Sequence, residues 1–267
     1  MGKGQIIGFG RTAEIVVWDE NRILKLFRDG WSISSVKWEE TVARAVYEAG
    51  LPVPAVYGVI EKDGRHGIIY ERVYGPSMLQ KLISKPEELE HFAFMFAELH
   101  AQMHSLKIRK LPSHRQQLEK KICNAKVLLN VRMEAVLKAL QQLPDDNVLC
   151  HGDFHPDNIL MSASGPVVID WNDATQGNPD ADIARTLLLL KQGEPVQPFE
   201  LDSERIQSMR NLFIKTYLRR YDQVRPISLA NIELWRLPVA AARLSEDIKE
   251  EESRLLSIVE MLTNEHL

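Results

Sequence analysis

The hydrophobic pattern of this chain changes once, near Gly75 and Pro76, and this change restricts the fold more than any other feature. Before it, short segments rich in Ile, Val and Leu are separated by turn residues. They predict strands over residues 5–9, 13–18 and 22–27 and a hairpin over 55–75 that turns at Asp63-Gly64. Between them, residues 35–49 have helical spacing. The first part of the chain is therefore predicted to be a sheet with one helix.

After the change, apolar residues recur at helical spacing through most of the chain. Helices are predicted over residues 87–106, 115–143, 178–191, 203–221 and about 227–264, the last in one or more pieces. Strand character is limited to residues 148–150, 159–161 and 166–170, with a Ser-Ala-Ser-Gly turn joining the last two. The sequence predicts an α+β protein, with a small β-rich lobe over residues 1–75 and a larger helical lobe over residues 76–267.

Charge and composition disfavour several kinds of partner. The 267 residues include 37 acidic and 33 basic side chains, a formal net charge of −4, which disfavours nucleic acid and anionic membranes. No apolar run has the length needed to span a bilayer, and the start, MGKGQI, has no secretory apolar segment. The two cysteines lack the spacing of a zinc site and fit a reducing compartment. We expect a cytoplasmic protein.

Two glycines, Gly8 and Gly10, lie in the sequence GFGRTAEIV between the first two predicted strands. Their bare backbone allows a phosphate to approach closely, but glycines in a hairpin are also ordinary turn residues. Ala13 replaces the third glycine of a GxGxxG pattern, and a strand follows instead of a helix, which disfavours a dinucleotide-binding fold. Phosphate contact and a plain turn remain alternatives.

Lys25 lies in RILKLF, a predicted strand with apolar residues on both faces. A buried ammonium needs an anion, either a carboxylate or a ligand phosphate; the alternative is an edge strand from which Lys25 reaches solvent. Glu39 lies on the apolar stripe of the next predicted helix, whereas Glu40 is turned further towards solvent. We predict an ion pair between Lys25 and Glu39, with Glu40 as the alternative partner.

The segment HGDFHPDNIL, residues 151–160, supplies oxygen ligands just before a predicted hairpin. Asn158 begins this hairpin and Asp170 ends it, so the two side chains are expected to lie close together. Carboxylate and amide oxygens suit Mg²⁺. Asp153, five residues before Asn158, is expected nearby, where it can accept or orient a hydroxyl proton.

HGDFHPDNIL, VVIDWNDA and GNPDADIAR together resemble the aminoglycoside phosphotransferase and choline-kinase-like family, small-molecule kinases with a protein-kinase-like fold. The resemblance spans nearly the whole chain, and HGDxHPxNIL followed by IDW is its most specific part. It implies a two-lobed enzyme that transfers the γ-phosphoryl group of ATP to a hydroxyl group of a small acceptor. These motifs are compatible with several acceptors: aminoglycosides, choline, homoserine, thiamine and methylthioribose. They are also compatible with GTP in place of ATP as the phosphoryl donor.

The resemblance also implies roles for individual residues. Asp153 is the implied catalytic base, and Asn158 and Asp170 are the implied ligands of Mg²⁺. The implied nucleotide-binding residues contact the phosphates, anchor the lysine that does so, or meet adenine at the hinge between the lobes: Gly8, Gly10 and Lys25 at the phosphates, Glu39 as the anchor, and Glu71 to Val73 at the hinge. His151-Gly-Asp replaces the His-Arg-Asp of protein kinases, so gating by phosphorylation is not expected.

Asp182, in DADIAR, resembles the buried aspartate with which the family braces its catalytic loop. It is also an acid in the first turn of a helix that Asn178 and Pro179 are expected to begin. Both descriptions are compatible. His151 is expected to be structural and bonded to backbone, and His155 has no assigned role.

Two other functions remain open. His151, Asp153, His155 and Asp157 alternate as zinc ligands do in a metallohydrolase, and a kinase homologue that binds nucleotide without turnover has the same motifs. His100 and His104 lack the Glu of HExxH, and an amphipathic helix explains them.

A substrate site is sought in the C-terminal helices. Glu251 lies on an apolar stripe with Asp247 beside it, so these carboxylates are candidates to meet a cationic acceptor. The alternative is a solvated acidic face.

Overall fold

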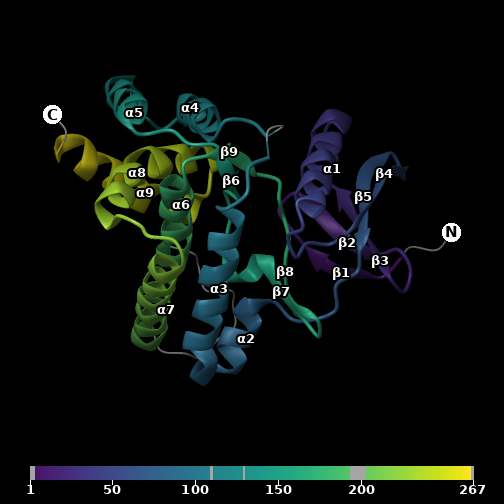
Figure 1. Ribbon diagram of the computed structural model, residues 1–267. Helices are drawn as coiled ribbons and strands as arrows, with labels where there is room; N and C mark the ends of the chain where they lie inside the picture. The colour runs from purple at the N-terminus through teal and green to yellow at the C-terminus, as the bar shows by residue number, and fades with distance from the viewer. Residues whose placement is uncertain (1–3, 109–110, 129, 193–202, 266–267) are drawn as a thin grey trace. The chain divides into compact units, whose positions relative to one another are not determined.

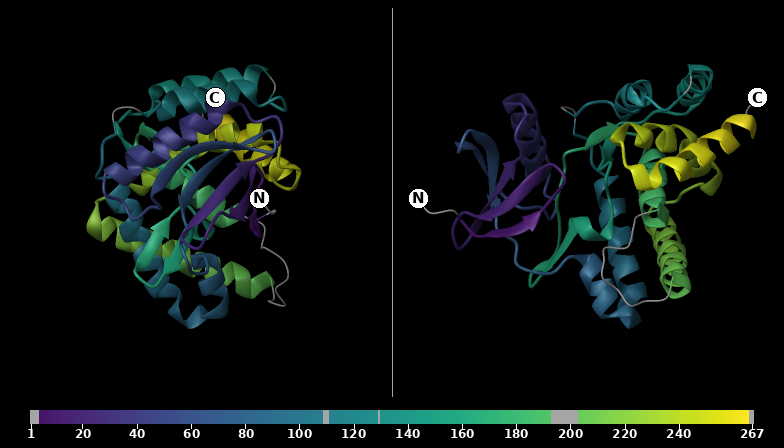
Figure 2. Two further views of the ribbon diagram at one scale, coloured as in Figure 1. Left: turned by 90° about the vertical axis from the view of Figure 1, so that its right-hand side faces the viewer. Right: turned by 180° about the vertical axis from the view of Figure 1, so that it is seen from behind.

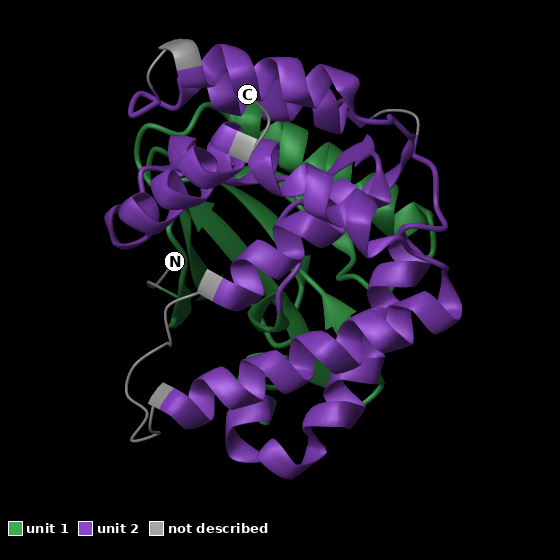
Figure 3. Cartoon of the chain, turned by 90° about the vertical axis from the view of Figure 1, so that its left-hand side faces the viewer, with its two compact units in different colours: residues 1–81, 156–172 green, residues 82–155, 173–267 purple. Residues whose placement is uncertain are grey.

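The computed structural model describes residues 4–108, 111–128, 130–192 and 203–265. The chain forms two compact units, shown in different colours in Figure 3. Unit 1 consists of residues 1–81 and 156–172, and unit 2 of residues 82–155 and 173–267. Each unit combines two separate segments of the chain, whereas each predicted lobe is one continuous segment.

The N-terminal part of unit 1 is a five-stranded antiparallel sheet with one helix (Figure 1). The strands, in their order across the sheet, are β1 (Ile6–Phe9), β2 (Ala13–Val17), β3 (Arg22–Phe27), β5 (Arg65–Glu71) and β4 (Val56–Lys62). Asp63 and Gly64 both have positive φ and form the predicted turn between β4 and β5. Helix α1 (Ile33–Glu48) begins at Ser32, whose hydroxyl accepts the Ser35 N–H, and packs against β4 and β5.

Apolar side chains are buried on both faces of this sheet. One cluster, which includes residues of α1, is Ala13, Phe27, Val36, Ala43, Val56 and Ile68, and the other is Val16, Leu24, Leu26 and Ile69. Lys25 lies in β3 between Leu24 and Leu26 of the second cluster and two residues before Phe27 of the first. The prediction that both faces of this strand are buried is therefore confirmed, and the ammonium group of Lys25 requires an anion.

A second, two-stranded sheet in unit 1 is the predicted hairpin of β7 (Ile159–Ser162) and β8 (Gly165–Val168). Its backbone is bonded to the N-terminal segment: the N–H groups of Met161 and Val168 donate to the carbonyls of Pro76 and Pro52, each at 2.8 Å. Gly75 permits this approach, because a Cβ atom there would lie 2.1 Å from the Met161 carbonyl oxygen. These contacts hold the hairpin against the N-terminal segment of unit 1.

Unit 2 is mainly helical. Its α-helices are α3 (Leu89–Met103), α4 (His114–Asn124), α5 (Asn130–Gln142), α6 (Pro179–Gln192), α7 (Ser203–Val224), α8 (Leu229–Arg243) and α9 (Lys249–Glu265). Helix α3 runs alongside α7 (Figures 1 and 2), and α8 contacts α4, α5, α6 and α9. Strands β6 (Val148–Cys150) and β9 (Thr175–Gly177) pair antiparallel. The predicted α+β class is confirmed.

Several predicted elements differ from the structure. The single helix predicted over 115–143 is wrong: α4 ends at Asn124 and α5 begins at Asn130, and residue 129 lies outside the described residues. The C-terminal helical region is interrupted at Asp247, which has positive φ, after the short helix η3 (Leu244–Glu246). Helix α2 (Met78–Ser84) and strand β9 were not predicted, because segments this short carry too little periodic pattern. Among the described helices, none has the length and apolar character needed to cross a membrane.

Candidate active site

The loop that carries Asp153 is hydrogen-bonded through its backbone to the carboxylate of Asp182. The N–H groups of His151 and Gly152 donate to the two carboxylate oxygens of Asp182 at 2.7 and 2.8 Å. Asp182 is fully buried in the first turn of α6, which begins where the Asn178 side chain accepts the Asp180 N–H at 2.8 Å. Both predicted descriptions of Asp182, as a brace and as a first-turn acid, are confirmed.

Glycine is required in this loop. Gly152 has a φ of 78°, and a Cβ atom there would lie 2.6 Å from the carbonyl oxygen of Asp173. The ring of His151 is buried, and its Nδ1 accepts the Asp153 N–H at 3.2 Å, which confirms the predicted structural role of this histidine. Asp157, the fourth residue of the metallohydrolase pattern, belongs to unit 1, where its carboxylate accepts the Ser77 hydroxyl at 2.6 Å.

Asp182 has two further partners that were not predicted. His100 and His104 each donate Nε2–H to the same carboxylate oxygen, at 3.1 and 3.2 Å, because an ionised carboxylate can only accept. Their Nδ1 atoms accept the hydroxyls of Tyr217 and Tyr221 at 2.8 and 2.6 Å. Burial alone would raise the pKa of Asp182, but the histidine hydrogen bonds hold that pKa well below its usual range.

The atoms of His100, His104 and Asp182 lie within 4.8 Å of one another, close enough to suggest a metal centre. However, the Asp182 oxygens already accept four hydrogen bonds, and each histidine uses both ring nitrogens. This donor set is satisfied without a cation, so we interpret it as a hydrogen-bonded brace.

The buried histidines of unit 2 predict acid-sensitive stability. Burial lowers the pKa of His114 to about 4 and that of His100 to about 3, whereas an unfolded histidine titrates near pH 6.5. Between these values only the unfolded chain binds the proton, so stability rises with pH up to about pH 6.5 and is lost as pH falls towards 4. Each histidine contributes a slope of at most about 1.4 kcal/mol per pH unit.

We expect His114→Gln to weaken the pH dependence of Tm between pH 4 and 6.5, as measured by thermal denaturation at a series of pH values. His91→Gln, on the exposed face of α3, is the control and is expected to leave the pH profile as it is. An unchanged profile for His114→Gln would show that this histidine is not buried in its neutral form.

Asp153 is largely buried and ionised. Its carboxylate oxygens lie 3.5 Å from Arg185 Nη2 and 3.5 Å from His155 Nε2. Burial alone would raise the pKa of Asp153, but the hydrogen bond from His155 and the charge of Arg185 hold that pKa well below its usual range. The carboxylate is thus ready to accept a hydrogen bond from a hydroxyl group.

Arg185 was not identified from the sequence, although a signal for it is present. It lies three residues after Asp182 on α6, in an otherwise apolar stretch, and its Nε donates to the Gly152 carbonyl at 3.1 Å. A cation on a buried helical face requires an anion, which is the same reasoning that identified Lys25. His155, to which no role was assigned, contacts Asp153.

In unit 1, Lys25 forms the predicted ion pair with Glu39, at 2.8 Å. Glu40 pairs instead with Arg44, on the same helix, so the alternative partner is wrong. Lys25 Nζ also lies 2.9 Å from Asp170 Oδ1, which was not predicted. Burial alone would lower the pKa of Lys25, but Asp170 and Glu39 raise it above its usual value.

The two ends of the β7–β8 hairpin lie side by side, which brings the backbone of Asn158 next to Ile169, the residue before Asp170. The Ile169 N–H donates to the Asn158 carbonyl at 3.0 Å, directly beyond the pair Ile159 and Val168. Asp170 has a φ of 64°, and its side chain is 42% exposed, whereas Asn158 is buried. An amide and a carboxylate at adjacent backbone positions are hard oxygen donors of the kind that Mg²⁺ prefers, so these residues fit this cation.

The remaining nucleotide-binding candidates lie along the sheet of unit 1. Gly8 lies in β1 opposite Ile15, and the Gly10 N–H donates to the Ala13 carbonyl at 2.8 Å. A Cβ atom at either glycine would make only ordinary contacts, so packing within the chain does not require glycine there. Glu71 ends β5, and its carboxylate accepts the Ala55 N–H at 3.0 Å. Val73 follows in the segment after β5 and is partly buried.

Of the two candidate substrate carboxylates, Asp247 is exposed after η3, but Glu251 is buried. Both oxygens of Glu251 accept from Arg243, at 2.8 and 2.9 Å. The expectation of a solvated acidic face is therefore wrong for Glu251, because its cation comes from the chain itself. Arg243 was missed, although a lone cation in the apolar stretch VAAARL indicates a buried ion pair.

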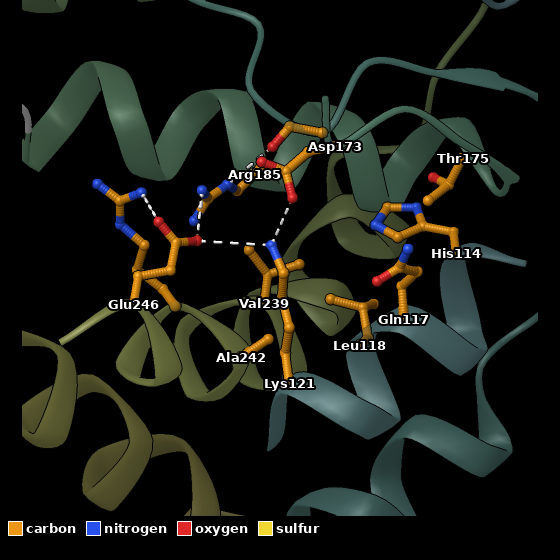
Figure 4. A pocket seen from close by; sticks show the side chains of 12 residues that line it. His114, Gln117, Leu118, Lys121, Asp173, Thr175, Arg185, Val239, Ala242 and Glu246 are labelled. Carbon is orange, nitrogen blue, oxygen red and sulfur yellow. Dashed lines mark hydrogen bonds and ion pairs between the residues drawn. The ribbon is translucent and has the colours of Figure 1, made fainter. Parts of the chain in front are cut away.

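Unit 2 also contains a hollow that is partly open to solvent (Figure 4). Its walls include Gly152, which precedes Asp153 in the chain, and Arg185, which contacts Asp153. Residues of α4, α6, α8, β9 and η3 contribute the rest of the lining. The hollow therefore lies beside the Asp153 loop within unit 2.

A five-stranded antiparallel sheet followed by a helical region is the fold of kinase-like phosphotransferases. The sequence model of the phosphotransferase enzyme family matches residues 7–227, so this chain belongs to that family, and the resemblance found in the motifs is confirmed.

The chain is also similar to individual proteins. Over 180 residues the chain is 26% identical to acyl-CoA dehydrogenase family member 10 of Mus musculus; the match covers 59% of this chain but only 17% of that protein. A thermostable mutant of aminoglycoside phosphotransferase APH(4)-Ia, in a ternary complex with ADP and hygromycin B, has a TM-score of 0.67 at 13% identity, covering 97% of this chain and 92% of that one. Choline kinase from Cryptosporidium parvum has a TM-score of 0.61 at 16% identity, covering 98% and 89%. At these identities the two structures establish the fold alone.

Proposed function

We propose that this chain transfers the γ-phosphoryl group of ATP to a hydroxyl group of a small molecule. The observation that carries the proposal is the cluster in unit 1 in which Lys25 pairs with Glu39 and Asp170 beside Asn158. This cluster combines a fixed cation for phosphate with oxygen ligands for Mg²⁺, the two requirements of phosphoryl transfer that a protein must supply. Aminoglycoside phosphotransferase APH(4)-Ia, which shares the fold, binds ADP in its ternary complex.

In this proposal, residues 1–75 form the nucleotide-binding lobe. Gly8 and Gly10 cover the phosphates, because bare backbone allows their close approach. Lys25 contacts the phosphates, and Glu39 holds the lysine in place. The backbone of residues 71–73, between Glu71 and Val73, meets adenine.

Asn158 and Asp170 are the residues that hold Mg²⁺ in the proposed enzyme. When bound, this ion would offset the negative charge of the nucleotide phosphates. Asp170 can serve both the ion and Lys25, because its carboxylate has two oxygens and is partly exposed.

Residues 76–267 form the proposed catalytic and substrate-binding lobe. The ionised carboxylate of Asp153 orients the acceptor hydroxyl and accepts its proton as the new O–P bond forms and the bond to the ADP oxygen breaks. Arg185 and His155 hold this carboxylate in position. The body of the acceptor binds in the hollow of unit 2. The position of this hollow beside the Asp153 loop supports this placement.

The proposal is tested by incubating the protein with Mg-ATP and a panel of small hydroxyl acceptors, with ADP release and phosphorus NMR of the product as readouts. Asp170→Asn is expected to raise the Mg²⁺ concentration needed for half-maximal transfer and to lower the rate by about tenfold or more. Asparagine tolerates the positive φ at this position, so the backbone should be retained.

Asp63→Asn, the same chemical change at an exposed turn with positive φ, is the matched control and should leave transfer unchanged. If Asp170→Asn keeps the Mg²⁺ dependence of the parent protein, Asp170 is not a metal ligand. If Mg-ATP stabilises the protein against heat but no acceptor supports ADP release, the chain binds nucleotide without turnover.

A further inference from the structure

The hollow in unit 2 has two kinds of polar wall (Figure 4). Uncharged polar side chains, those of His114, Gln117 and Thr175, lie on one side. Charged side chains lie on the other side and bridge to one another, as the dashed lines in the figure show. Apolar side chains from α4 and α8, Leu118, Val239 and Ala242, complete the lining.

On the charged side, the carboxylate of Glu246 forms ion pairs with three cationic side chains of the chain. Its oxygens lie 2.8 Å from Arg185 Nη2, 2.5 Å from Arg243 Nη1 and 3.7 Å from Lys121 Nζ. The side chains of Arg185 and Arg243 are only 8% and 6% exposed, and Arg243 is balanced from the buried side by Glu251. Displacing either arginine would leave a buried charge unpaired, so Glu246 is not available to a ligand cation.

Lys121 is the cation of this wall that can change partners. Its side chain is 29% exposed, and its Nζ lies 2.8 Å from Oδ1 of Asp173, which is 41% exposed. An ion pair this exposed is weak, because water competes for both groups. A lysine carries its ammonium on a flexible four-carbon stem, so Lys121 can exchange Asp173 for an anionic group of a ligand at little cost.

The uncharged side provides a second observation at this hollow. His114 and Thr175 are 7% and 2% exposed. Within the described part of the chain, neither His114 Nδ1 nor Thr175 Oγ1 has a hydrogen-bond partner, and both atoms are buried. Buried polar atoms are normally paired, so a ligand in the hollow that reaches these two side chains would satisfy atoms that the chain leaves unpaired.

We propose that the acceptor bound in this hollow carries an anionic group, a carboxylate or a phosphate, which Lys121 binds, and a polar group that hydrogen-bonds to Thr175 and His114. This inference rests on the proposed function and specifies its substrate class. The acceptor is a hydroxyl-bearing acid with a short apolar portion that packs on Leu118, Val239 and Ala242.

The same wall disfavours a polycationic acceptor. Glu246 and Asp173, its two carboxylates, both have cationic partners from the chain itself. An acceptor amine would have to compete with these partners and would lie beside three positive side chains, those of Lys121, Arg185 and Arg243. Displacing a buried arginine from its carboxylate is costly, so we expect aminoglycoside-like polyamines to be poor ligands here.

The test compares molecules that share a skeleton and a hydroxyl group but differ in charge. Lactate is compared with propylene glycol and isopropanolamine, and glycerol phosphate with glycerol; the two sets distinguish a carboxylate from a phosphate. Binding is measured by ligand-observed NMR without nucleotide, and transfer by ADP release with Mg-ATP. We expect the anionic member of at least one set to bind more tightly than its partners.

Charge reversal provides the critical comparison. Lys121→Glu is expected to weaken binding of the preferred anion by about tenfold to a hundredfold, the effect of losing a charge-assisted hydrogen bond. Lys121→Arg should retain most of the parental affinity for this anion. Lys120→Glu, on the exposed face of the same helix, is the matched control and should change little.

If lactate and glycerol phosphate bind in a Lys121-dependent manner but no acceptor is phosphorylated, the inferred site stands and the proposed function fails. If transfer occurs but prefers isopropanolamine or a polyamine, and Lys121→Glu improves it, the inference is overturned and the proposed function stands. Binding of neither anion, or binding unaffected by Lys121→Glu, also overturns the inference.

Discussion

Replacing Asp153 by asparagine is expected to lower the rate of phosphoryl transfer by about 10²–10⁴-fold, the usual contribution of a positioned general base. Asparagine has the same shape but cannot accept the hydroxyl proton. The loop should keep its conformation, because the backbone N–H groups of His151 and Gly152, not the Asp153 side chain, bind to Asp182. The measurement is ADP release at saturating Mg-ATP and acceptor.

Binding of Mg-ATP, measured by thermal shift, should be retained in Asp153→Asn, because the proposed nucleotide ligands are other residues. Asp63→Asn again serves as the control for the chemical change itself. Transfer at the parental rate by Asp153→Asn would rule out Asp153 as the base. Loss of both transfer and Mg-ATP binding would indicate a structural role instead.

Replacing Lys25 by methionine is expected to affect both stability and transfer. The change leaves Glu39 buried without its cation, and breaking a buried ion pair in this way costs about 3–5 kcal/mol. Methionine has a similar length and is apolar, so packing between the two clusters of the sheet should be retained. The free energy of unfolding, from denaturant titration, should fall by this amount, and phosphoryl transfer should fall with it.

The double variant Lys25→Met with Glu39→Gln separates the two effects. Neutralising Glu39 removes the unpaired buried charge, so much of the lost stability should return. Transfer should not return, because the proposed phosphate contact is still missing. Recovery of transfer in the double variant would show that Lys25 acts only through folding stability, and an unchanged stability in Lys25→Met would contradict burial of the ion pair.

Short-range arrangements of the candidate site were predictable from the sequence. Alternation in RILKLF and the apolar stripe of the following helix led to the pair of Lys25 and Glu39, because strand and helix periods determine which face a residue occupies. Likewise, a tight turn aligns the two strands of a hairpin, so the backbone of Asn158 lies opposite that of Ile169, next to Asp170. Asp182 followed from the resemblance of DADIAR to a family motif and from helix-start signals.

Contacts between distant elements were not predictable in the same way. His100 and His104 were explained as residues of an amphipathic helix, but packing of α3 against α7 places them between Asp182 and two tyrosines. Glu251 was considered as a ligand for a substrate amine, yet α8 brings Arg243 to it. In both cases the local pattern shows that a polar residue lies on a particular helix face but not which element covers that face.

The α+β class, the five strands and one helix of the N-terminal part, the hairpin between Asn158 and Asp170 and the buried Lys25–Glu39 pair follow from the sequence alone, because all of these depend on local periodicity and turn chemistry. Which charges meet around the hollow in unit 2 depends on the tertiary structure. Arg243 and Glu246 are near neighbours in the chain, but Lys121, Asp173 and Arg185 come from distant segments, and their pairing depends on how the helices pack. In the proposed enzyme, that packing leaves Lys121 more exposed than Arg185 and Arg243, which makes Lys121 the proposed ligand of the acceptor.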